Sequence, residues 1–138
     1  MAGEQVRSPG ARLFRPFVVT GAEDGMALVD EEQFGPALPL VAFRYERQAI
    51  EQANAGPFGL GASVWSADPE RAAAVACELQ AGTTWINAHG PVAAGQPVVG
   101  TKASGYGAQG GRWGMEELSG LRVLVEPAPA AVSGTTGS

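Results

Sequence analysis

Residues 38–87 alternate between strand-like and helix-like runs, and this order restricts the folds that the chain can adopt. Runs of β-branched, aromatic and aliphatic residues predict strands, and runs of helix formers with apolar residues on one face predict helices. The strands are expected at 38–43, 60–66 and 83–87, and the helices at 46–54 and 68–79. Short connections in this order favour parallel pairing. The sequence therefore predicts an α/β fold with a parallel-type sheet flanked by helices.

End signals support both helices. Gly56 and Pro57 stop the first helix, while Asp68 is a candidate N-cap and Pro69 the first helical residue of the second. The strand at 60–66 is apolar on both faces, which predicts a buried strand in a sheet covered on each side.

The flanking sequence is less regular. Further elements are expected as a strand at 14–20, a turn at 21–25, a long loop at 88–107, a short helix at 110–118 and a last strand at 121–125. Polar, Pro-rich and Gly-rich composition predicts a disordered leader at 1–10 and a disordered tail at 127–138.

Net charge and cysteine content narrow the partners and the compartment. The formal net charge is −5 and the nine basic residues are scattered, which disfavours nucleic acid and anionic membranes as partners. No apolar run approaches the ~18 residues of a membrane span, and residues 1–5 lack a signal-peptide pattern. One cysteine cannot form an internal disulfide, which fits a reducing compartment. We therefore expect a cytoplasmic protein with no nucleic-acid or membrane partner.

Residues 31–36, Glu-Glu-Gln-Phe-Gly-Pro, form a polar corner directly before the apolar run at 37–43. The Gly-Pro turn stiffens the corner and places two carboxylates and an aromatic ring at a strand mouth. Loops at strand ends often carry functional sites. The alternative is a surface turn with two solvated acids and one buried phenylalanine.

This corner is the first of four motifs. They are Glu-Glu-Gln-Phe-Gly-Pro at 31–36, Asn-Ala-Gly-Pro-Phe-Gly-Leu-Gly-Ala-Ser-Val-Trp-Ser at 54–66, Ala-Gly-Thr-Thr-Trp-Ile-Asn at 81–87 and Gly-Thr-Lys-Ala-Ser-Gly-Tyr-Gly at 100–107. They resemble E-E-x-F-G-P, N-x-x-x-Y-G-L-G-A-S-V-W-S, A-G-T-V-W-I-N and G-x-K-x-S-G-x-G of the NAD(P)-dependent aldehyde dehydrogenase superfamily. One Gly-rich match is a weak signal, whereas four in family order are a strong one. The resemblance covers roughly 12–126 and corresponds to the C-terminal part of that family's chain.

The resemblance implies a cofactor site for NAD or NADP. Glu32 corresponds to the carboxylate that accepts hydrogen bonds from the nicotinamide ribose hydroxyls, which suits a diol because a carboxylate can accept from both. Phe34 corresponds to the aromatic residue beside the nicotinamide ring, where a flat apolar wall limits the tilt of the ring. The alternative for Phe34 is plain core packing.

The resemblance also implies that some motif residues stabilise the fold and that others line the path of the substrate. Asn87, and the block of Lys102, Ser104 and Gly105, match family positions that hold strand ends and loops. The loop at 89–99 corresponds to part of the aldehyde entry tunnel, but it contains no aromatic residue, and 97–100 reads Pro-Val-Val-Gly where the family usually has P-F-G-G. Substrate preference therefore does not carry over.

No catalytic residue is predicted. Cys77 lies in the second predicted helix beside Glu78, which disfavours the thiolate that catalysis needs, so we expect a structural helix cysteine. His89 follows a strand end, but no second member of a dyad can be named, and we expect a loop histidine without a catalytic role. One Cys and one His cannot fill a tetrahedral metal site.

The family's nucleophilic Cys, its general-base Glu and its nucleotide-binding unit lie upstream of the motifs matched here. The resemblance divides the chain into a partial catalytic domain at 11–120 and an oligomerisation-type strand at 121–126.

We therefore expect the chain to be the C-terminal segment of an aldehyde dehydrogenase. Alone it should be inactive, and it should form a homo-oligomer or join a complementary aldehyde dehydrogenase chain. Two alternatives remain: a non-catalytic interaction module that pairs with a full-length relative, and a truncated gene product. A segment should expose apolar faces along 60–64 and 83–86, whereas an evolved module should hide them.

Overall fold

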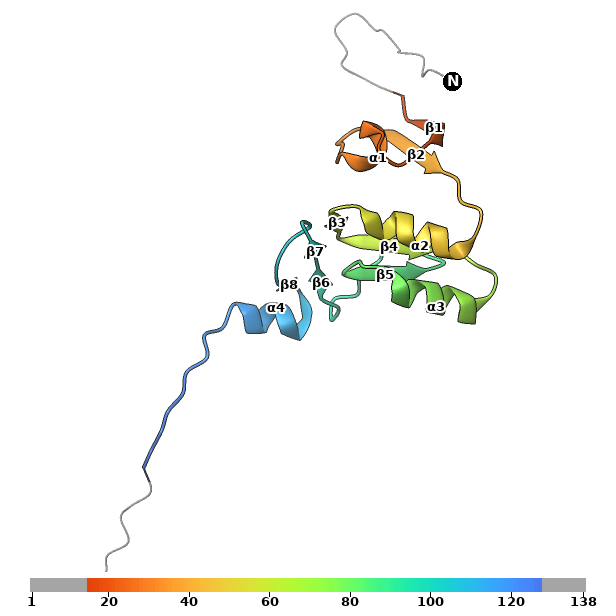
Figure 1. Cartoon of the computed structure of the whole chain (residues 1–138). Coiled ribbons are helices and arrows are strands. Elements are labelled where there is room, and N and C mark those ends of the chain that lie inside the picture. The colour runs from red at the N-terminus through yellow and green to blue at the C-terminus, as the bar shows by residue number, and fades with distance from the viewer. Residues whose placement is uncertain (1–14, 128–138) are drawn as a thin grey trace, which may run out of the picture.

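The computed structural model describes residues 15–127 (Figure 1). The predicted leader at 1–10 and all but Pro127 of the predicted tail lie outside the described residues. The elements are β1 (Phe17–Ala22), α1 (Ala27–Asp30), β2 (Ala37–Val41), α2 (Glu46–Ala55), β3 (Phe58–Gly59), β4 (Gly61–Val64), α3 (Pro69–Glu78), β5 (Thr83–Ile86), β6 (Val98–Val99), β7 (Thr101–Lys102), β8 (Ala108–Gln109) and α4 (Gly111–Glu117). The α/β class predicted from the sequence is confirmed.

The longer strands pair in parallel, as predicted. β1 pairs with β2 from Phe17 opposite Ala37 onward, with an irregularity between Thr20 and Ala22. β4 pairs with β5 along its whole length. The two pairs do not join into one sheet: the described strands form four separate two-stranded sheets.

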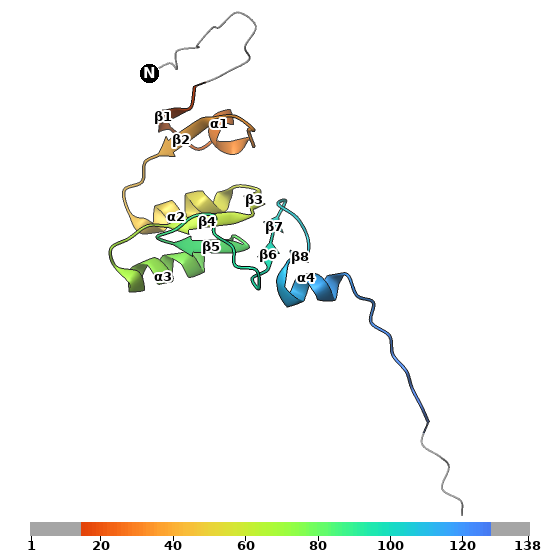
Figure 2. The same ribbon diagram turned by 180° about the vertical axis from the view of Figure 1, so that it is seen from behind.

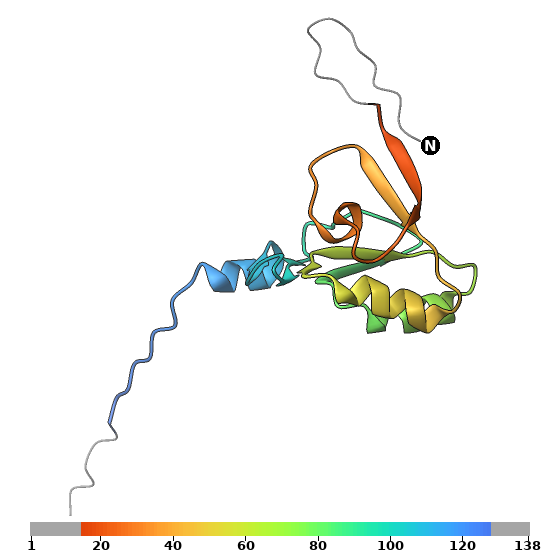
Figure 3. The same ribbon diagram turned by 45° about the horizontal axis from the view of Figure 1, so that its top comes forward.

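The unit β4–α3–β5 is built around a well-capped helix. One carboxylate oxygen of Asp68, Oδ1, accepts hydrogen bonds from the backbone N–H groups of Glu70 and Arg71, each at 3.0 Å, and Pro69 is the first helical residue. This satisfies two N–H groups that a helix start otherwise leaves without a partner. α2 and α3 lie on the same side of the β4–β5 pair (Figures 1 and 3), and Ala72 of α3 is completely buried.

The predicted long loop at 88–107 contains two short strands. β7 pairs antiparallel with β3, and β6 pairs antiparallel with β8, which follows the loop. Glycines make the close backbone approaches possible, because a Cβ added at Gly82 would collide with the carbonyl oxygen of Val99. Strands of two residues are too short to produce a period in the sequence.

Little apolar surface is fully buried. Among the described residues, the buried hydrophobic residues are Ala22, Ile50 and Ala72. β4 is half-exposed, so the prediction of a strand covered on both sides is wrong: the helices cover one side, and β4 has one partner strand. Leu60 and Ile86 are exposed, as expected of a segment rather than of a self-contained module.

The last predicted strand is absent. Helix α4 forms where it was predicted, but residues 121–127 have no regular secondary structure and lead away from the other elements (Figures 1 and 2). An extended segment becomes a strand only when another strand accepts and donates its backbone hydrogen bonds, and none does so here. Leu121 is 97% exposed. Among the described residues, no helix has the length and apolar character needed to cross a membrane.

Candidate cofactor site

The corner follows α1, a helix that the sequence did not predict, and Glu31 and Gln33 are bonded to it. The backbone N–H of Glu31 donates to the carbonyl of Ala27 at 2.9 Å, and Nε2 of Gln33 donates to the carbonyl of Leu28 at 2.6 Å. A helix of four residues has no readable period, which is why the sequence analysis missed it. The helix ends at Asp30, and the chain then turns through the Gly-Pro pair into β2.

Glu32 lies in a pocket of about 480 Å³ between this corner and the β3–β4 segment. The pocket combines carboxylates from α1 and the corner with main chain of β3 and β4 and with the loop after β7. Its lining residues are Val29, Asp30, Glu31, Glu32, Phe58, Gly59, Leu60, Gly61, Ala103 and Ser104. Glu32 itself is exposed. The site thus offers an accessible carboxylate beside a wall made partly of glycine backbone.

The motif at 100–107 holds this wall in place. Oγ of Ser104 accepts a hydrogen bond from the N–H of Gly59 at 2.9 Å, and Oγ1 of Thr101 donates to the carbonyl of Gly59 at 2.9 Å. Nζ of Lys102 donates to the carbonyls of Asn54, at 2.6 Å, and Gly56, at 3.0 Å, at the end of α2. These positions therefore have the structural role expected of them.

The two motif asparagines also hold loops. Asn87 adopts a left-handed φ of 51°, and its amide makes two hydrogen bonds of 2.9 Å with the backbone of Ser66. The amide of Asn54 bridges the carbonyl of Glu78 and the N–H of Gln80, each at 2.8 Å. Each side chain replaces a backbone partner at a point where no strand or helix provides one.

Phe34 does not lie in the pocket with Glu32. Its side chain is 99% exposed and makes no wall of the pocket. The alternative of plain core packing is therefore wrong for the described chain. The cofactor contacts of Glu32 and Phe34 stay predictions.

The structure also places the two residues that the sequence analysis considered as catalytic candidates, the single cysteine and the single histidine. Cys77 lies on a helix, α3, as expected, and its side chain is exposed rather than buried. Nδ1 of His89 lies 2.5 Å from Oγ of Ser63, a partner that sequence reasoning did not find because it is 26 residues away in the chain. The β4–β5 register, which sets Ser63 opposite Trp85, brings the two segments together. Among the described residues, no group of three His, Cys, Asp or Glu side chains could hold a metal ion.

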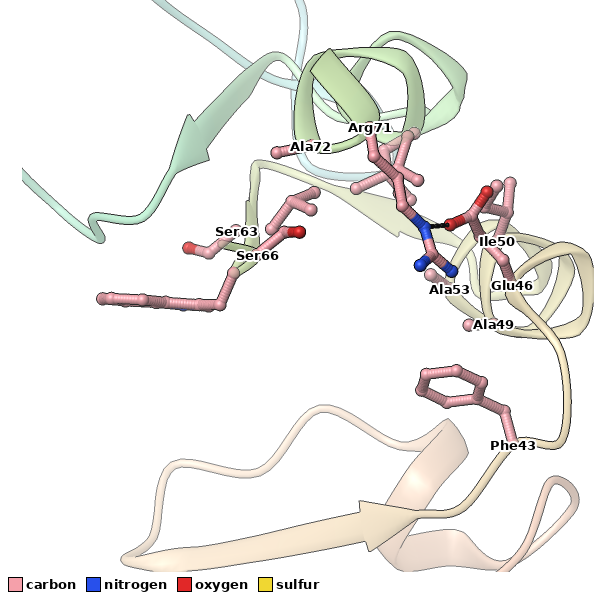
Figure 4. Close-up of a pocket in the computed structure, with 13 residues that line it drawn as sticks. Phe43, Glu46, Ala49, Ile50, Ala53, Ser63, Ser66, Arg71 and Ala72 are labelled. Carbon is pink, nitrogen blue, oxygen red and sulfur yellow. Dashed lines mark hydrogen bonds and ion pairs between the residues drawn. The ribbon is translucent and has the colours of Figure 1, made fainter. Parts of the chain in front are cut away.

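A second pocket, of about 440 Å³, lies between α2, α3 and β4 (Figure 4). Most of its lining is apolar, and Phe43 faces it from the segment before α2. Nε of Arg71 donates to Glu46 at 2.5 Å and ties α3 to α2 at one side of the pocket. This hydrogen bond and the charge of Glu46 raise the pKa of Arg71 above its ordinary value.

Comparison with known proteins agrees with this architecture. The model of the aldehyde dehydrogenase family matches residues 2–124. A betaine aldehyde dehydrogenase of Cereibacter sphaeroides is 42% identical over 120 residues, which are 87% of this chain and 25% of the relative. Human 4-trimethylaminobutyraldehyde dehydrogenase is 41% identical over 110 residues, 80% of this chain and 22% of the relative.

Solved structures give the same result. A betaine aldehyde dehydrogenase from Staphylococcus aureus in complex with NAD+ matches with a TM-score of 0.73 and 41% identity, over 75% of this chain and 21% of that one. An NAD-dependent aldehyde dehydrogenase from Sinorhizobium meliloti matches with a TM-score of 0.77 and 37% identity, over 86% of this chain and 24% of that one. The fold and the motifs thus match an α/β segment of these aldehyde dehydrogenase structures.

The chain belongs to the aldehyde dehydrogenase family. It spans about 25% of the length of the curated relatives that it matches first.

Proposed function

We propose that this chain supplies the nicotinamide-ribose side of the cofactor site in an NAD-dependent aldehyde dehydrogenase. The observation that carries the proposal is the exposed Glu32 carboxylate in a pocket with a glycine-backbone wall. A carboxylate can accept hydrogen bonds from two neighbouring hydroxyls. NAD in a structure of the Staphylococcus aureus relative favours NAD over NADP.

The role of Phe34 in this proposal depends on a neighbour that covers its ring. A large aromatic side chain that is almost fully exposed gains free energy when a flat apolar surface packs on it. The nicotinamide ring, or another part of an aldehyde dehydrogenase beside it, would provide that surface.

Oxidation itself requires groups from outside the described residues. NAD, when bound, accepts the hydride, while a thiolate must attack the aldehyde and hydrogen-bond donors must stabilise the resulting oxyanion. The described residues hold one thiol, Cys77, and it is exposed on α3 and lines none of the pockets described above. The chain would therefore contribute to catalysis as part of a larger polypeptide or assembly.

Complementation tests this proposal. The chain is combined with a polypeptide that carries the remaining part of a betaine aldehyde dehydrogenase, and NADH formation is followed with betaine aldehyde. We expect aldehyde-dependent NADH formation, with Glu32→Gln raising the KM for NAD about tenfold through the loss of hydrogen bonds to a charged group. Glu31→Gln, in the same pocket, is the matched control and should leave the KM unchanged. An equal effect of both variants would contradict the assigned role of Glu32.

A second candidate function is interaction with another chain through the exposed segment at 121–125. Its leucine and valine side chains are between 74% and 97% exposed, and its backbone has no partner strand. A segment of this kind gains hydrogen bonds by adding to an open sheet edge. The partner would be a second copy of this chain or a complementary aldehyde dehydrogenase chain.

Oligomeric state tests this candidate. We expect the chain to elute from size exclusion as an oligomer, and Leu124→Pro to shift it toward monomer, because proline removes a ladder donor. Val92→Ala, at an exposed position in the loop before β6, is the control and should not change elution. A monomeric parent chain would contradict the role for the segment when it is alone.

We infer a cytoplasmic location. The single thiol, Cys77, is free and exposed, which fits a reducing compartment. Fractionation of the native cells, followed by detection of the chain in the cytoplasmic fraction, is the direct test.

A further inference from the structure

The turn between β1 and α1 contains the sequence Asp24-Gly25, which the cofactor site does not use. The N–H of Met26 donates to the carbonyl of Glu23 at 3.2 Å and closes a turn around these two residues. Both residues are exposed, and Gly25 has a left-handed φ of 89°. The turn therefore presents to solvent both the side chain of Asp24 and the peptide nitrogen that follows it.

The peptide nitrogen of Gly25 is free to react. A carboxyl carbon and the nitrogen of the next residue can close a five-membered imide ring when that nitrogen is accessible. Among the hydrogen bonds of residues 15–127, none is donated by the N–H of Gly25. No atom lies within 4 Å of the position that a Cβ of Gly25 would occupy, and a glycine backbone can rotate toward the ring geometry with little steric cost.

The sequence has three aspartates, and the other two lack these features. Asp30 is the last residue of α1 and precedes Glu31, whose N–H donates to the carbonyl of Ala27 at 2.9 Å. Asp68 precedes a proline, whose nitrogen carries no hydrogen, and its Oδ1 accepts two backbone hydrogen bonds. The chemistry therefore singles out Asp24.

One contact restrains the reacting carboxylate. Nε2 of Gln52, on α2, donates to Oδ2 of Asp24 at 3.0 Å. Ring closure requires the carboxyl carbon to turn toward the nitrogen of Gly25, so this hydrogen bond must break first. Because Asp24 is exposed, water can replace the glutamine, and the restraint slows the reaction without preventing it.

We propose that Asp24-Gly25 is a site of spontaneous isoaspartate formation and that Gln52 slows it. The nitrogen of Gly25 forms a bond to the side-chain carboxyl carbon of Asp24, the bond from that carbon to its hydroxyl oxygen breaks, and the hydroxyl leaves as water with the amide proton. Water then adds to the former main-chain carbonyl carbon of Asp24, and the bond from that carbon to the nitrogen breaks. The main chain now runs through the side-chain carbon, and the former main-chain carbonyl is a free carboxylate.

This modification would act on the corner through α1. The product lengthens the main chain by one methylene between β1 and α1. The carbonyl of Met26 accepts hydrogen bonds from the N–H groups of Val29 and Asp30, at 2.8 and 3.0 Å, so a shift at the turn is transmitted to the helix. Glu31 and Gln33 are bonded to this helix, and the corner is therefore the first part of the site expected to move.

The experiment uses the unmodified 138-residue chain, incubated for several weeks at physiological pH and temperature. Endoprotease Asp-N cleaves before aspartate but not before isoaspartate, and mass spectrometry with electron-transfer fragmentation then locates the isoaspartate. We expect loss of cleavage before residue 24 and unchanged cleavage before Asp30 and Asp68.

A pair of glutamine variants tests the restraint. Gln52→Ala should speed isoaspartate formation about fivefold, the factor that corresponds to one typical net hydrogen bond. Gln48→Ala is the matched control, because Gln48 lies on the same helix but accepts from the N–H of Arg44. The proposal is overturned if residue 24 of the unmodified chain stays aspartate, if isoaspartate forms equally fast at Asp30, or if Gln52→Ala reacts no faster than Gln48→Ala.

Discussion

Two strand–helix–strand units follow one another in this chain, and they differ in how much of their own surface they cover. In β4–α3–β5, the helix between the strands packs against them and Ala72 is 0% exposed. In β1–α1–β2, the connecting helix has four residues, and Leu38 on β2 is 58% exposed. Both units have parallel strands, so the difference comes from the length and packing of the connection.

The difference also separates structural motifs from functional ones. In and around β4–α3–β5, the motif residues Asn54 and Asn87 and the cap residue Asp68 find hydrogen-bond partners inside the chain. In the corner between α1 and β2, Glu32 and Phe34 are exposed. Residues with internal partners maintain the fold, whereas exposed motif residues mark the surface where a ligand or another chain is expected.

The largest difference in stability between the two units should appear when one glycine in each is replaced by alanine. A Cβ at Gly82 would collide with the backbone carbonyl of Val99, so Gly82→Ala should lower the free energy of unfolding by about 3 kcal/mol. Gly35, in the exposed corner, has no atom within 4 Å of the position that a Cβ would occupy, so Gly35→Ala should change stability by less than about 0.5 kcal/mol. Thermal unfolding followed by circular dichroism compares them. Equal effects would remove the distinction between the two units.

Asn87 should have the next largest effect. Asn87→Ala removes two hydrogen bonds to Ser66 and leaves alanine at a φ of 51°, which should cost about 2 kcal/mol in urea unfolding. Asn87→Gly keeps the left-handed backbone without strain and should cost less. If both variants are equally destabilised, backbone strain has no part in the loss.

The cap of α3 should contribute less. Asp68→Ala removes the acceptor of two N–H groups and should destabilise the chain by about 1 kcal/mol. Asp68→Ser keeps an N-cap acceptor and should recover most of the loss. Both are measured by the same urea titration, and a failure of serine to recover stability would mean that Asp68 acts through its charge instead.

Phe34 should have the smallest effect on the chain alone. Its ring is 99% exposed, so Phe34→Ala should change the free energy of unfolding by less than about 0.5 kcal/mol. The same substitution should weaken NAD binding once the chain is part of a complemented dehydrogenase. A large loss of stability in the isolated chain would show that Phe34 belongs to its core.

Sequence patterns predicted the parts of the fold whose cause is local. The Asp68-Pro69 start of α3 and the Gly56 stop of α2 are local signals, and both elements form within one or two residues of the predicted bounds. Elements that depend on distant partners were predicted poorly. The two-residue strands, which form through pairing across the chain, were missed, and the strand predicted at 121–125 is absent because it lacks a partner strand. The Ser63–His89 pair was missed for the same reason, because strand register brings it together.

Hydrogen–deuterium exchange, with and without NAD and a complementary aldehyde dehydrogenase chain, tests the central claim most directly. The claim is that the chain maintains β4–α3–β5 by itself, while the corner at 31–36 requires the rest of a dehydrogenase. In the isolated chain we predict slow exchange in α3 and β5 and fast exchange at 31–36, unchanged by NAD. In the complemented protein, NAD should slow exchange at 31–36. Protection of 31–36 by NAD in the isolated chain, or equally fast exchange in both units, would contradict the account.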